Sequence, residues 1–374
     1  MKVLLCTPFL ESPDVVSSGI GTWARNIMAY NQETGNEIEI VPVSFDRYTH
    51  IEEYTVGGFK RHFSGIKEVG KCVIKALHKM KAERPDLIHI CTSGNLGFIK
   101  DIILARAARK KGIKSIVHFH FGRIPDVIQE KGFEYSLLRK LLSLADTIIV
   151  IDGESFRVLK EIGGPNIVYV PNPVTNSFLK DEVKQQKSIE RISNTAIFVG
   201  HVVPTKGVVE LVESCCQIQG LLLRIIGKCS DEMKERLRML AMKRDNGSWC
   251  SFAGEIPHKE VISEMLKADL LVFPSYTEAF PNVVLEAMAC GSVIISTPVG
   301  AIPELLEEDE FGQYGVLVPP QSVDALADAI HTVSRNDALK AEMRRNSQRR
   351  VRERYSISVV WEQLTDVWRG NSHE

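Results

Sequence analysis

The chain has 374 residues, of which 44% are hydrophobic and 25% charged, and its formal net charge is -1. This length exceeds what one ordinary hydrophobic core organises and predicts two domains of about 170–190 residues. The balanced charge excludes a broad nucleic-acid-binding surface, and no apolar run reaches the roughly 18 residues of a membrane span, so we expect a cytoplasmic protein without a signal peptide.

The first half of the chain alternates short apolar runs with longer amphipathic stretches. Strands are expected at Lys2–Cys6, Ile38–Val43, Asp86–Cys91, Ser115–Phe119, Thr147–Ile151 and Ile167–Val170, and helices at Thr22–Tyr30, Ile66–Arg84, Gly97–Lys111 and Glu134–Leu144. Several of these strands are apolar on consecutive residues, which is typical of parallel strands covered by helices on both faces. Strands that alternate with helices predict a parallel, doubly wound sheet.

A polar segment, Lys180–Ser193, separates this series from a second one of the same kind. The second series has expected strands at Thr195–Val199, Leu221–Ile226, Trp249–Phe252, Asp269–Phe273, Val293–Ser296 and Gly315–Val318, and helices at Val208–Cys216, Asp231–Arg244, His258–Leu266, Asn282–Cys290 and Ser322–Val333. We therefore predict a Rossmann-like domain over residues 1–175, a linker over 176–194 and a second Rossmann-like domain over 195–352. Residues 353–374 are expected to form a last helix that packs back on the first domain through an apolar face. Ligands of such sheets bind beyond the carboxyl ends of the strands, so the cleft between the domains is the expected site.

The segment Phe273–Gly291, FPSYTEAFPNVVLEAMACG, is the most informative part of the chain. It runs from a strand end through a polar turn into a helix expected to begin near Phe280, with Pro281 suited to the first helical turn and Gly291 to the position after the last. A helix N-terminus at the carboxyl edge of a strand predicts a site for an anion such as a pyrophosphate. The backbone N–H groups expected to face this anion belong to Asn282, Val283 and Val284.

Two glutamates flank the predicted anion site. Glu278 precedes the helix, and Glu286 lies a little over one turn inside it. A carboxylate is a poor neighbour for phosphate and a good acceptor for paired hydroxyls, such as those of a ribose or a sugar ring. The alternative is that Glu278 is a first-turn charge that favours the helix dipole and that Glu286 is solvated.

The stretch PSYTEAFPNVVLEAMACGSVIISTPVGAIPELL, with Glu278-x7-Glu286 inside it, closely resembles the signature of the retaining family 4 glycosyltransferases. Weaker similarities follow the family's order along nearly the whole chain. They are SSGIG at Ser17–Gly21, VHFH at Val117–His120, VPNPV at Val170–Val174, FVGHVVPTKG at Phe198–Gly207, LRIIG at Leu223–Gly227 and SFAGEI at Ser251–Ile256. The resemblance implies an α/β protein of GT-B architecture, with two Rossmann-like, doubly wound parallel-sheet domains facing across a cleft. The first domain would bind the acceptor and the second the nucleotide sugar.

The resemblance also implies roles for individual residues. Glu286 would hold the ribose hydroxyls, Glu278 the hydroxyls of the transferred sugar, and Lys206 would neutralise the diphosphate. His120 is similar to a histidine that the family places close to the reacting sugar. The implied catalytic residues are His120, Glu278 and Lys206, and the implied acceptor-binding residues are Gly19 and His120. The implied donor-binding residues are Gly21, Gly200, His201, Lys206, Gly227, Glu255, Ile256, Glu278, Ala279, Phe280, Pro281, Asn282, Val283 and Glu286.

The chain departs from the family pattern after Gly200, where an arginine is frequent and this sequence has His201. A neutral imidazole donates one hydrogen bond and supplies no full charge, so Lys228 or Arg224 would have to compensate. The usual second glycine after Gly227 is also missing.

Two other nucleotide-binding classes are not supported. The GIG of residues 19–21 is followed by Ala24, so it is not the G-x-G-x-x-G fingerprint of a nicotinamide-dependent oxidoreductase. The sequence contains no G-x-x-x-x-G-K-[ST] loop of a kinase or ATPase. A tight turn alone remains the alternative for these glycines.

His118 and His120 form an H-x-H pair on one face of a predicted strand. Such a pair suits a metal, but no third ligand of matching spacing follows, and the eight cysteines are scattered without a C-x-x-C pair. We therefore expect no metal and no other cofactor, with His118 as a hydrogen-bonded core residue.

Four lysines repeat at every fourth position along the predicted helix Ile66–Arg84, beside an apolar row. They are Lys67, Lys71, Lys75 and Lys79. This pattern is typical of a core-facing helix with a solvated face, and also of a helix on an anionic membrane surface. Peripheral contact with the inner membrane surface therefore stays open, and it would suit a lipid-linked acceptor.

The predicted reaction transfers a hexose-type sugar from a nucleoside diphosphate to an acceptor hydroxyl with retention of configuration, in surface polysaccharide or glycolipid assembly. The resemblance implies a front-face mechanism in which the leaving phosphate helps to deprotonate the acceptor, and no carboxylate pair presents itself for a hydrolase. One alternative is a nucleotide-sugar hydrolase or epimerase of the same architecture. Another is a weakly active sugar-nucleotide-binding protein, which His201 suggests. The residues leave the nucleotide, the sugar and the acceptor open.

Overall fold

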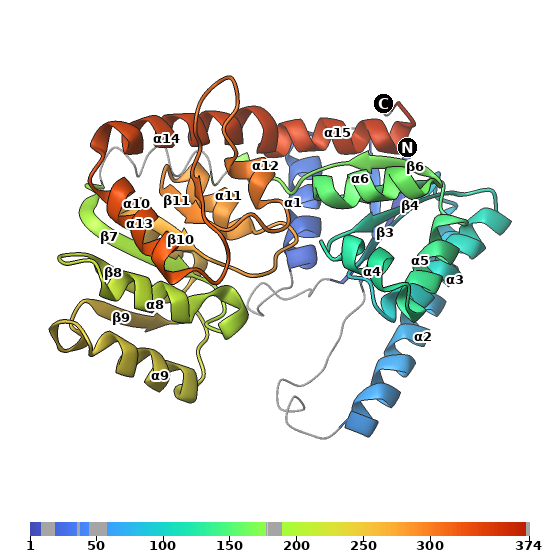
Figure 1. Cartoon of the computed structure of the whole chain (residues 1–374). Coiled ribbons are helices and arrows are strands. Elements are labelled where there is room, and N and C mark those ends of the chain that lie inside the picture. The colour runs from blue at the N-terminus through green and yellow to red at the C-terminus, as the bar shows by residue number, and fades with distance from the viewer. Residues whose placement is uncertain (9–18, 36–37, 45–57, 177, 179–188, 372–374) are drawn as a thin grey trace. The chain divides into compact units, whose positions relative to one another are not determined.

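The computed structural model describes residues 1–8, 19–35, 38–44, 58–176, 178 and 189–371. The chain forms two compact units, unit 1 from Met1–Asn172 with Val360–Glu374, and unit 2 from Pro173–Val359. Each unit contains a six-stranded sheet in which all neighbouring strands are parallel, with helices in the connections between strands (Figure 1). The predicted fold class, two doubly wound parallel-sheet domains, is confirmed.

The sheet of unit 1 has the strand order β2-β1-β3-β4-β5-β6. Its strands are β1 (Lys2–Thr7), β2 (Glu39–Ser44), β3 (Leu87–Thr92), β4 (Lys114–Phe119), β5 (Thr147–Val150) and β6 (Asn166–Tyr169). Its helices are α1 (Gly19–Glu33), α2 (Gly58–Glu83), α3 (Gly97–Lys110), α4 (Ile124–Glu130), α5 (Phe133–Leu142) and α6 (Gly153–Ile162). The last helix of the chain, α15 (Ile357–Arg369), belongs to this unit from Val360 onward.

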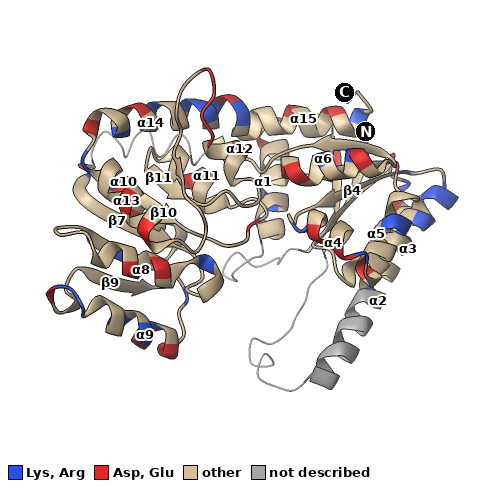
Figure 2. Ribbon diagram, in the orientation of Figure 1, with Lys and Arg blue, Asp and Glu red and all other residues tan. Residues whose placement is uncertain are grey.

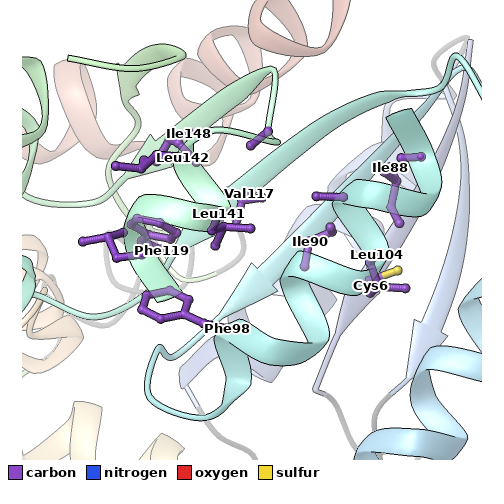
Figure 3. Close-up of a cluster of buried hydrophobic side chains, with 14 of the residues drawn as sticks. Cys6, Ile88, Ile90, Phe98, Leu104, Val117, Phe119, Leu141, Leu142 and Ile148 are labelled. Carbon is purple, nitrogen blue, oxygen red and sulfur yellow. The ribbon is translucent and has the colours of Figure 1, made fainter. Parts of the chain in front are cut away.

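Both faces of the unit 1 sheet are buried, which explains the consecutive apolar residues of its strands. One face carries a cluster of side chains from β1, β3, β4 and β5 that pack with α3 and α5 (Figure 3). This cluster includes Cys6, Ile88, Ile90, Phe98, Leu104, Val117, Phe119, Leu141, Leu142 and Ile148. Each large apolar side chain buried in this way stabilises the fold by about 1.5–3 kcal/mol. The alternate residues of β3 and β4 turn to the opposite face, and these include His89 and His118.

The sheet of unit 2 has the strand order β12-β11-β10-β7-β8-β9. Its strands are β7 (Ile192–Val199), β8 (Leu222–Ile226), β9 (Cys250–Gly254), β10 (Ala268–Phe273), β11 (Val293–Ser296) and β12 (Val316–Leu317). Its helices are η2 (Pro204–Lys206), α8 (Val208–Cys216), α9 (Asp231–Ala241), η3 (Asp245–Gly247), α10 (His258–Lys267), α11 (Asn282–Ala289), α12 (Ile302–Leu306), α13 (Val323–Ser334), α14 (Asp337–Arg350) and the π-helical turn η4 (Val351–Tyr355).

Helix α14 carries many charged residues (Figure 2), and ion pairs attach it to β10. The side chain of Lys340 is 3% exposed, and its Nζ lies 2.8 Å from Oδ2 of Asp269, whose other oxygen pairs with Arg344. Lys340 also donates to the carbonyl oxygen of Ser334 at 3.0 Å. A charge buried this deeply needs such partners. Part of the basic C-terminal region therefore anchors the strand that leads into the segment Phe273–Gly291.

Several boundaries differ from those predicted; helix α2, for example, begins at Gly58 instead of Ile66. Helix α1 begins at Gly19 instead of Thr22, so the first helical turn contains both glycines of the predicted loop. Strand β7 begins at Ile192, inside the predicted linker. Here the side chain of Arg191 donates to the backbone carbonyls of Ala268 at 2.6 Å and of Cys290, which fixes a polar strand start that has no apolar pattern.

Two further features of the described residues are the state of the cysteines and the length and polarity of the helices. All eight cysteines are free thiols; Cys6, Cys91, Cys215 and Cys290 are buried and the other four are half-buried. Within the described residues, every helix is too short or too polar to span a bilayer.

Candidate active site

Three glycines leave bare backbone at the carboxyl edge of the unit 2 sheet. Gly200 follows β7, Gly227 follows β8 and Gly254 ends β9, with φ angles of 150°, 136° and 72°. The N–H of Gly200 donates to the carbonyl of Ile226 at 3.0 Å, and that of Gly227 to the carbonyl of Gly254 at 2.8 Å. A Cβ atom on Gly227 would overlap the carbonyl oxygen of Gly200, so position 227 requires glycine.

A pocket of about 310 Å³ opens beside these glycines. It is lined by Val202, Ile225, Gly227, Lys228, Cys229, Asp231, Lys234, Phe252, Gly254 and Glu255. Two of the predicted donor-binding residues, Gly227 and Glu255, are therefore in its wall. Lys228 also lines it, whereas Arg224 pairs through Nε with Glu264 at 2.7 Å. Of the two cations predicted to compensate for His201, the one at the pocket is Lys228.

The predicted phosphate cation and the predicted sugar-binding carboxylate contact each other. The Nζ of Lys206, in η2, donates to Oε1 of Glu278, and their side chains are 24% and 12% exposed. Backbone bonds impose this proximity, because the N–H of Tyr276 donates to the carbonyl of Thr205 at 2.9 Å. Gly207 packs so closely on Pro274 that a Cβ there would overlap the proline carbonyl.

The Glu278 loop is held from its other side by residues 300–301. The N–H of Ala301 donates to the carbonyl of Ala279 at 2.9 Å, and a Cβ on Gly300 would overlap the carbonyl of Glu278. A loop fixed on both sides presents its carboxylate in one orientation, as a binding site requires.

Helix α11 begins at Asn282, as expected for the predicted helix Asn282–Cys290 and two residues after Phe280, with Pro281 as its N-cap instead of in its first turn. The N–H of Val284 donates to the carbonyl of Pro281 at 3.0 Å, so the prediction that this amide faces a ligand was wrong. Asn282, Val283 and Glu286 are half-buried, while the other residues of the helix are buried. Gly291 follows the helix with a φ of 65°, as predicted for the position after its end.

Glu286 has a partner that the sequence analysis missed. Its Oε1 lies 3.0 Å from Nε2 of His258, the first residue of α10. The hydrogen bond to Glu286 raises the pKa of His258 above its usual 6.5. The topology could have predicted this contact. Helix α10 connects β9 to β10, and in a doubly wound sheet such a connection leaves β9 at the carboxyl edge, so the start of α10 lies at the edge of the sheet where the site is expected.

In unit 1, His120 immediately follows β4 and is half-buried. Its N–H donates to the carbonyl of Thr92 at 3.0 Å, and its ring lies 3.9 Å from the ring of His118, centroid to centroid. Trp23 of α1 contacts both rings, at 4.9 Å from His118 and 5.0 Å from His120. Burial lowers the pKa of His120 to about 3, so its imidazole is neutral at physiological pH.

The prediction of a hydrogen-bonded His118 is half right. Its Nδ1 lies 3.3 Å from Nε2 of His89, but its own Nε2 is buried without a partner among the described residues. His89, Cys91 and His118 place one potential ligand atom each within 4.8 Å of one another. The spacing of residues in the sequence does not predict that His89 and Cys91 lie beside His118. They precede the H-x-H pair in the sequence, and the register of β3 and β4, which pairs Cys91 with His118, brings them next to it.

The other predicted site residues divide between the units. Gly19 and Gly21 lie in the first turn of α1, while Ser17 and the rest of the preceding loop lie outside the described residues. His201 is exposed, Phe280 is buried with its ring 6.1 Å from that of Tyr355, and Ile256 is half-buried. Lys206, Glu278 and Glu286 thus belong to unit 2, and His120 belongs to unit 1.

Comparison with known sequences matches both halves of the chain. Residues 17–178 match the family described as Glycosyltransferase Family 4, and residues 180–350 match Glycosyl transferases group 1. The teichuronic acid biosynthesis glycosyltransferase TuaC of Bacillus subtilis is 23% identical over 298 residues, which cover 74% of this chain and 68% of TuaC. The capsular polysaccharide biosynthesis glycosyltransferase CapM of Staphylococcus aureus is 25% identical over 331 residues, which cover 82% of this chain and 81% of CapM.

Solved structures with the same fold cover nearly the whole chain. Sucrose-phosphate synthase from Thermosynechococcus elongatus aligns with a TM-score of 0.76 at 20% identity, over 99% of this chain and 98% of that one. Anabaena HepE in complex with UDP aligns with a TM-score of 0.69 at 17% identity, over 99% of this chain and 100% of that one. These similarities establish the GT-B fold.

Proposed function

We propose that this chain, which belongs to the family 4 glycosyltransferases, transfers a hexose from a nucleoside diphosphate to an acceptor hydroxyl with retention of configuration. The observation that carries the proposal is the pairing of Lys206 with Glu278 next to the N-terminus of α11, on the same sheet edge as the 310 Å³ pocket. A cation, a carboxylate and a helix N-terminus in one place match a diphosphate attached to a sugar.

Donor binding would exchange the partners within this site. Lys206 would leave Glu278 for the diphosphate, whose negative charge grows as the glycosidic bond breaks. Glu278, released from the ammonium, would accept hydrogen bonds from hydroxyls of the sugar, and Glu286 would accept them from the ribose. The Lys206–Glu278 bond supports this scheme because it holds the two groups close together before the donor arrives.

The acceptor oxygen would attack the anomeric carbon from the face that the phosphate leaves. The carbon–oxygen bond to the acceptor forms as the bond to the phosphate breaks, and the departing phosphate oxygen takes the acceptor's proton. Neutral His120 would bind a sugar hydroxyl without adding charge. Lys206, Lys228 and the N-terminus of α11 supply positive charge in unit 2, which supports a mechanism without a metal ion.

The comparisons suggest a donor and a pathway class. HepE binds UDP and UDP-glucose, as its structures are described, so we propose a uridine diphosphate sugar as the first donor to test. TuaC and CapM take part in teichuronic acid and capsular polysaccharide biosynthesis by their names, which supports an acceptor in surface polysaccharide assembly.

Thermal unfolding with UDP, GDP, ADP, TDP and NAD, each with EDTA present, tests the donor site. We expect one nucleoside diphosphate to raise the midpoint by several degrees, since a ligand at about 100 times its Kd stabilises by about 2.7 kcal/mol. A rise with NAD alone, or with no nucleotide, would contradict the proposal. Product analysis with the matching nucleotide sugar, with and without acceptor, then separates transfer from hydrolysis.

We also propose that helices α2 and α3 of unit 1 contact an anionic membrane surface. The exposed residues of α3 are Ile99, Ile103, Arg106, Arg109 and Lys110, and Figure 2 shows further Lys and Arg on α5. The neighbouring helix α2 exposes Ile74, at 69%, between Lys71 and Lys75. The side chain of Lys67 lies outside the described residues. Apolar side chains beside cations suit the surface of an anionic bilayer.

Co-sedimentation with vesicles of phosphatidylcholine, with and without phosphatidylglycerol, checks this contact. We expect binding only to the anionic vesicles, release by high salt, and loss of binding in an Ile99→Ser, Ile103→Ser variant. A Met239→Ser, Met242→Ser variant, which removes exposed apolar side chains from unit 2, is the matched control. Equal loss in both variants, or equal binding to both kinds of vesicle, would contradict the proposal.

A further inference from the structure

Two histidines and a tryptophan are buried in unit 1, on the face of its sheet opposite the cluster in Figure 3. His89 of β3 and His118 of β4 are both 0% exposed, and Trp368 of α15 is 2% exposed. The Nε1 of Trp368 lies 2.9 Å from Nδ1 of His89, and Nε2 of His89 lies 3.3 Å from Nδ1 of His118. The three side chains thus form a chain of hydrogen bonds from α15 to β4.

The direction of this chain is fixed by the tryptophan. An indole N–H only donates, so Nδ1 of His89 carries no proton and accepts it. His89 is neutral and bears its proton on Nε2, from which it donates to Nδ1 of His118. His118 must then carry its own proton on Nε2. Burial lowers the pKa of both imidazoles, in agreement with the neutral forms that this order of donors requires.

The same order argues against a metal between His89, Cys91 and His118. The 3.3 Å between the two imidazole nitrogens suits ligands of a tetrahedral zinc as well as a hydrogen bond. A metal on Nε2 of His89 would, however, leave that ring without a proton, because Nδ1 already accepts from Trp368. His89 would have to be an imidazolate, so the geometry favours the hydrogen-bond chain.

The end of the chain lies against His120. The rings of His118 and His120 are 3.9 Å apart and inclined by 31°, and Trp23 packs edge-on against both. A flip of the His118 ring would break its bond to His89, so the chain holds the surface on which His120 stacks. The Nε2 of His120 is buried and has no partner among the described residues, so the orientation of this ring depends on the packing of His118 and Trp23.

We propose that Trp368 is a positioning residue, which acts through His89 and His118 to hold His120 in the orientation that contacts the sugar. The contact with the sugar rests on the proposed function, whereas the hydrogen-bond chain does not. The C-terminal helix thereby contributes to the site of unit 1 from 248 positions beyond His120 in the sequence (368 − 120).

Trp368→Phe tests the proposal, because it removes the indole N–H and keeps an aromatic ring. Trp361→Phe is the matched control, since Trp361 is a buried indole of the same helix and its ring touches Trp368. Nitrogen-15 spectra of histidine-labelled protein report which ring nitrogen carries the proton. We expect wild type and Trp361→Phe to show His89 and His118 protonated on Nε2, and Trp368→Phe to mix the tautomers and shift the His120 signals.

The kinetic expectation is a fall in kcat of about tenfold in Trp368→Phe, with the donor KM within about twofold, which corresponds to about 1.4 kcal/mol in the transition state alone. His89→Leu breaks the same hydrogen-bond chain from within; if Trp368→Phe folds poorly, His89→Leu should show the same fall in kcat, mixed tautomers of His118 and shifted His120 signals. Unchanged histidine spectra in Trp368→Phe, or the same change in Trp361→Phe, would overturn the proposal. If wild type transfers no sugar, the proposed function is wrong. The histidine spectra then test the hydrogen-bond chain from Trp368 to His118 on their own.

Discussion

Replacing Lys206 with alanine is expected to lower kcat/KM for sugar transfer by about 10²-fold or more, which corresponds to about 3 kcal/mol of transition-state stabilisation. A leaving diphosphate gains negative charge as the glycosidic bond breaks, and fixed cations stabilise that charge strongly in a shielded site. Lys206 is 24% exposed and held near its target by the η2 turn, whereas His201, where the family often has arginine, is exposed. We therefore expect Lys206 to make a larger contribution to stabilising the developing charge than His201 does.

Steady-state kinetics with the nucleotide sugar found by thermal unfolding would measure this loss. Lys206→Arg keeps the charge and should recover part of the rate, while Lys243→Ala, which removes an exposed lysine from unit 2, should resemble wild type. Wild-type kinetics in Lys206→Ala, or an equal loss in Lys243→Ala, would remove Lys206 from the site.

Glu278 offers an independent check on the same contact. Glu278→Gln removes the negative charge that Lys206 must leave before it reaches the diphosphate. We expect this variant to bind the free nucleoside diphosphate at least as tightly as wild type, yet to transfer sugar much more slowly, because its amide is a weaker partner for the sugar hydroxyls. Calorimetric titration with the diphosphate and kinetics with the sugar nucleotide separate the two effects. Weaker binding of the diphosphate would contradict the partner exchange.

The segment Phe273–Gly291 shows how much of the site can be predicted from sequence. Its strand end, Pro281 and Gly291 are local signals, and each constrains the backbone near its own position. The helix and its end therefore appear where expected. Pro281, expected in the first helical turn, lies one position before it, because it acts as the N-cap and its carbonyl accepts from Val284. Capping depends on backbone angles, which residue types restrict without determining.

Contacts between distant segments account for what the sequence did not predict. Trp368 reaches His89 across 279 positions, and Arg191 reaches the carbonyl of Cys290 across 99. Neither contact has a local pattern, because each depends on which helix ends beside which strand. The contact of His258 could be predicted in part. Its position at the start of a connecting helix follows from the topology, but its bond to Glu286 depends on how α10 packs against α11.

Glu286→Ala is the second substitution with a large expected effect, a loss of about 10²-fold in kcat/KM for the donor, or about 3 kcal/mol, if its carboxylate accepts from the ribose hydroxyls. A donor with a 2′-deoxyribose gives a sharper test than the rate alone. Wild type should lose activity with the deoxy donor, whereas Glu286→Ala should lose little more, because the contact is already gone. Additive losses would place the ribose elsewhere, and wild-type kinetics in Glu286→Ala would remove this residue from the site.

The bond between His258 and Glu286 adds a dependence on pH with a definite sign. The bond raises the pKa of His258 above 6.5, so the charged pair is complete at low pH and is lost as the pH rises through the raised pKa. The ribose competes with that pair for Glu286. Donor affinity should therefore increase as the pH rises above about 6.5, by a few-fold only, because the His258 side chain is 64% exposed and solvent screens the pair.

His258→Gln should make donor affinity, measured by titration from pH 6 to 8, independent of pH in this range and raise it at the acidic end. A dependence that persists in His258→Gln would assign the titration to another group and leave Glu286 to be judged by the deoxy donor alone.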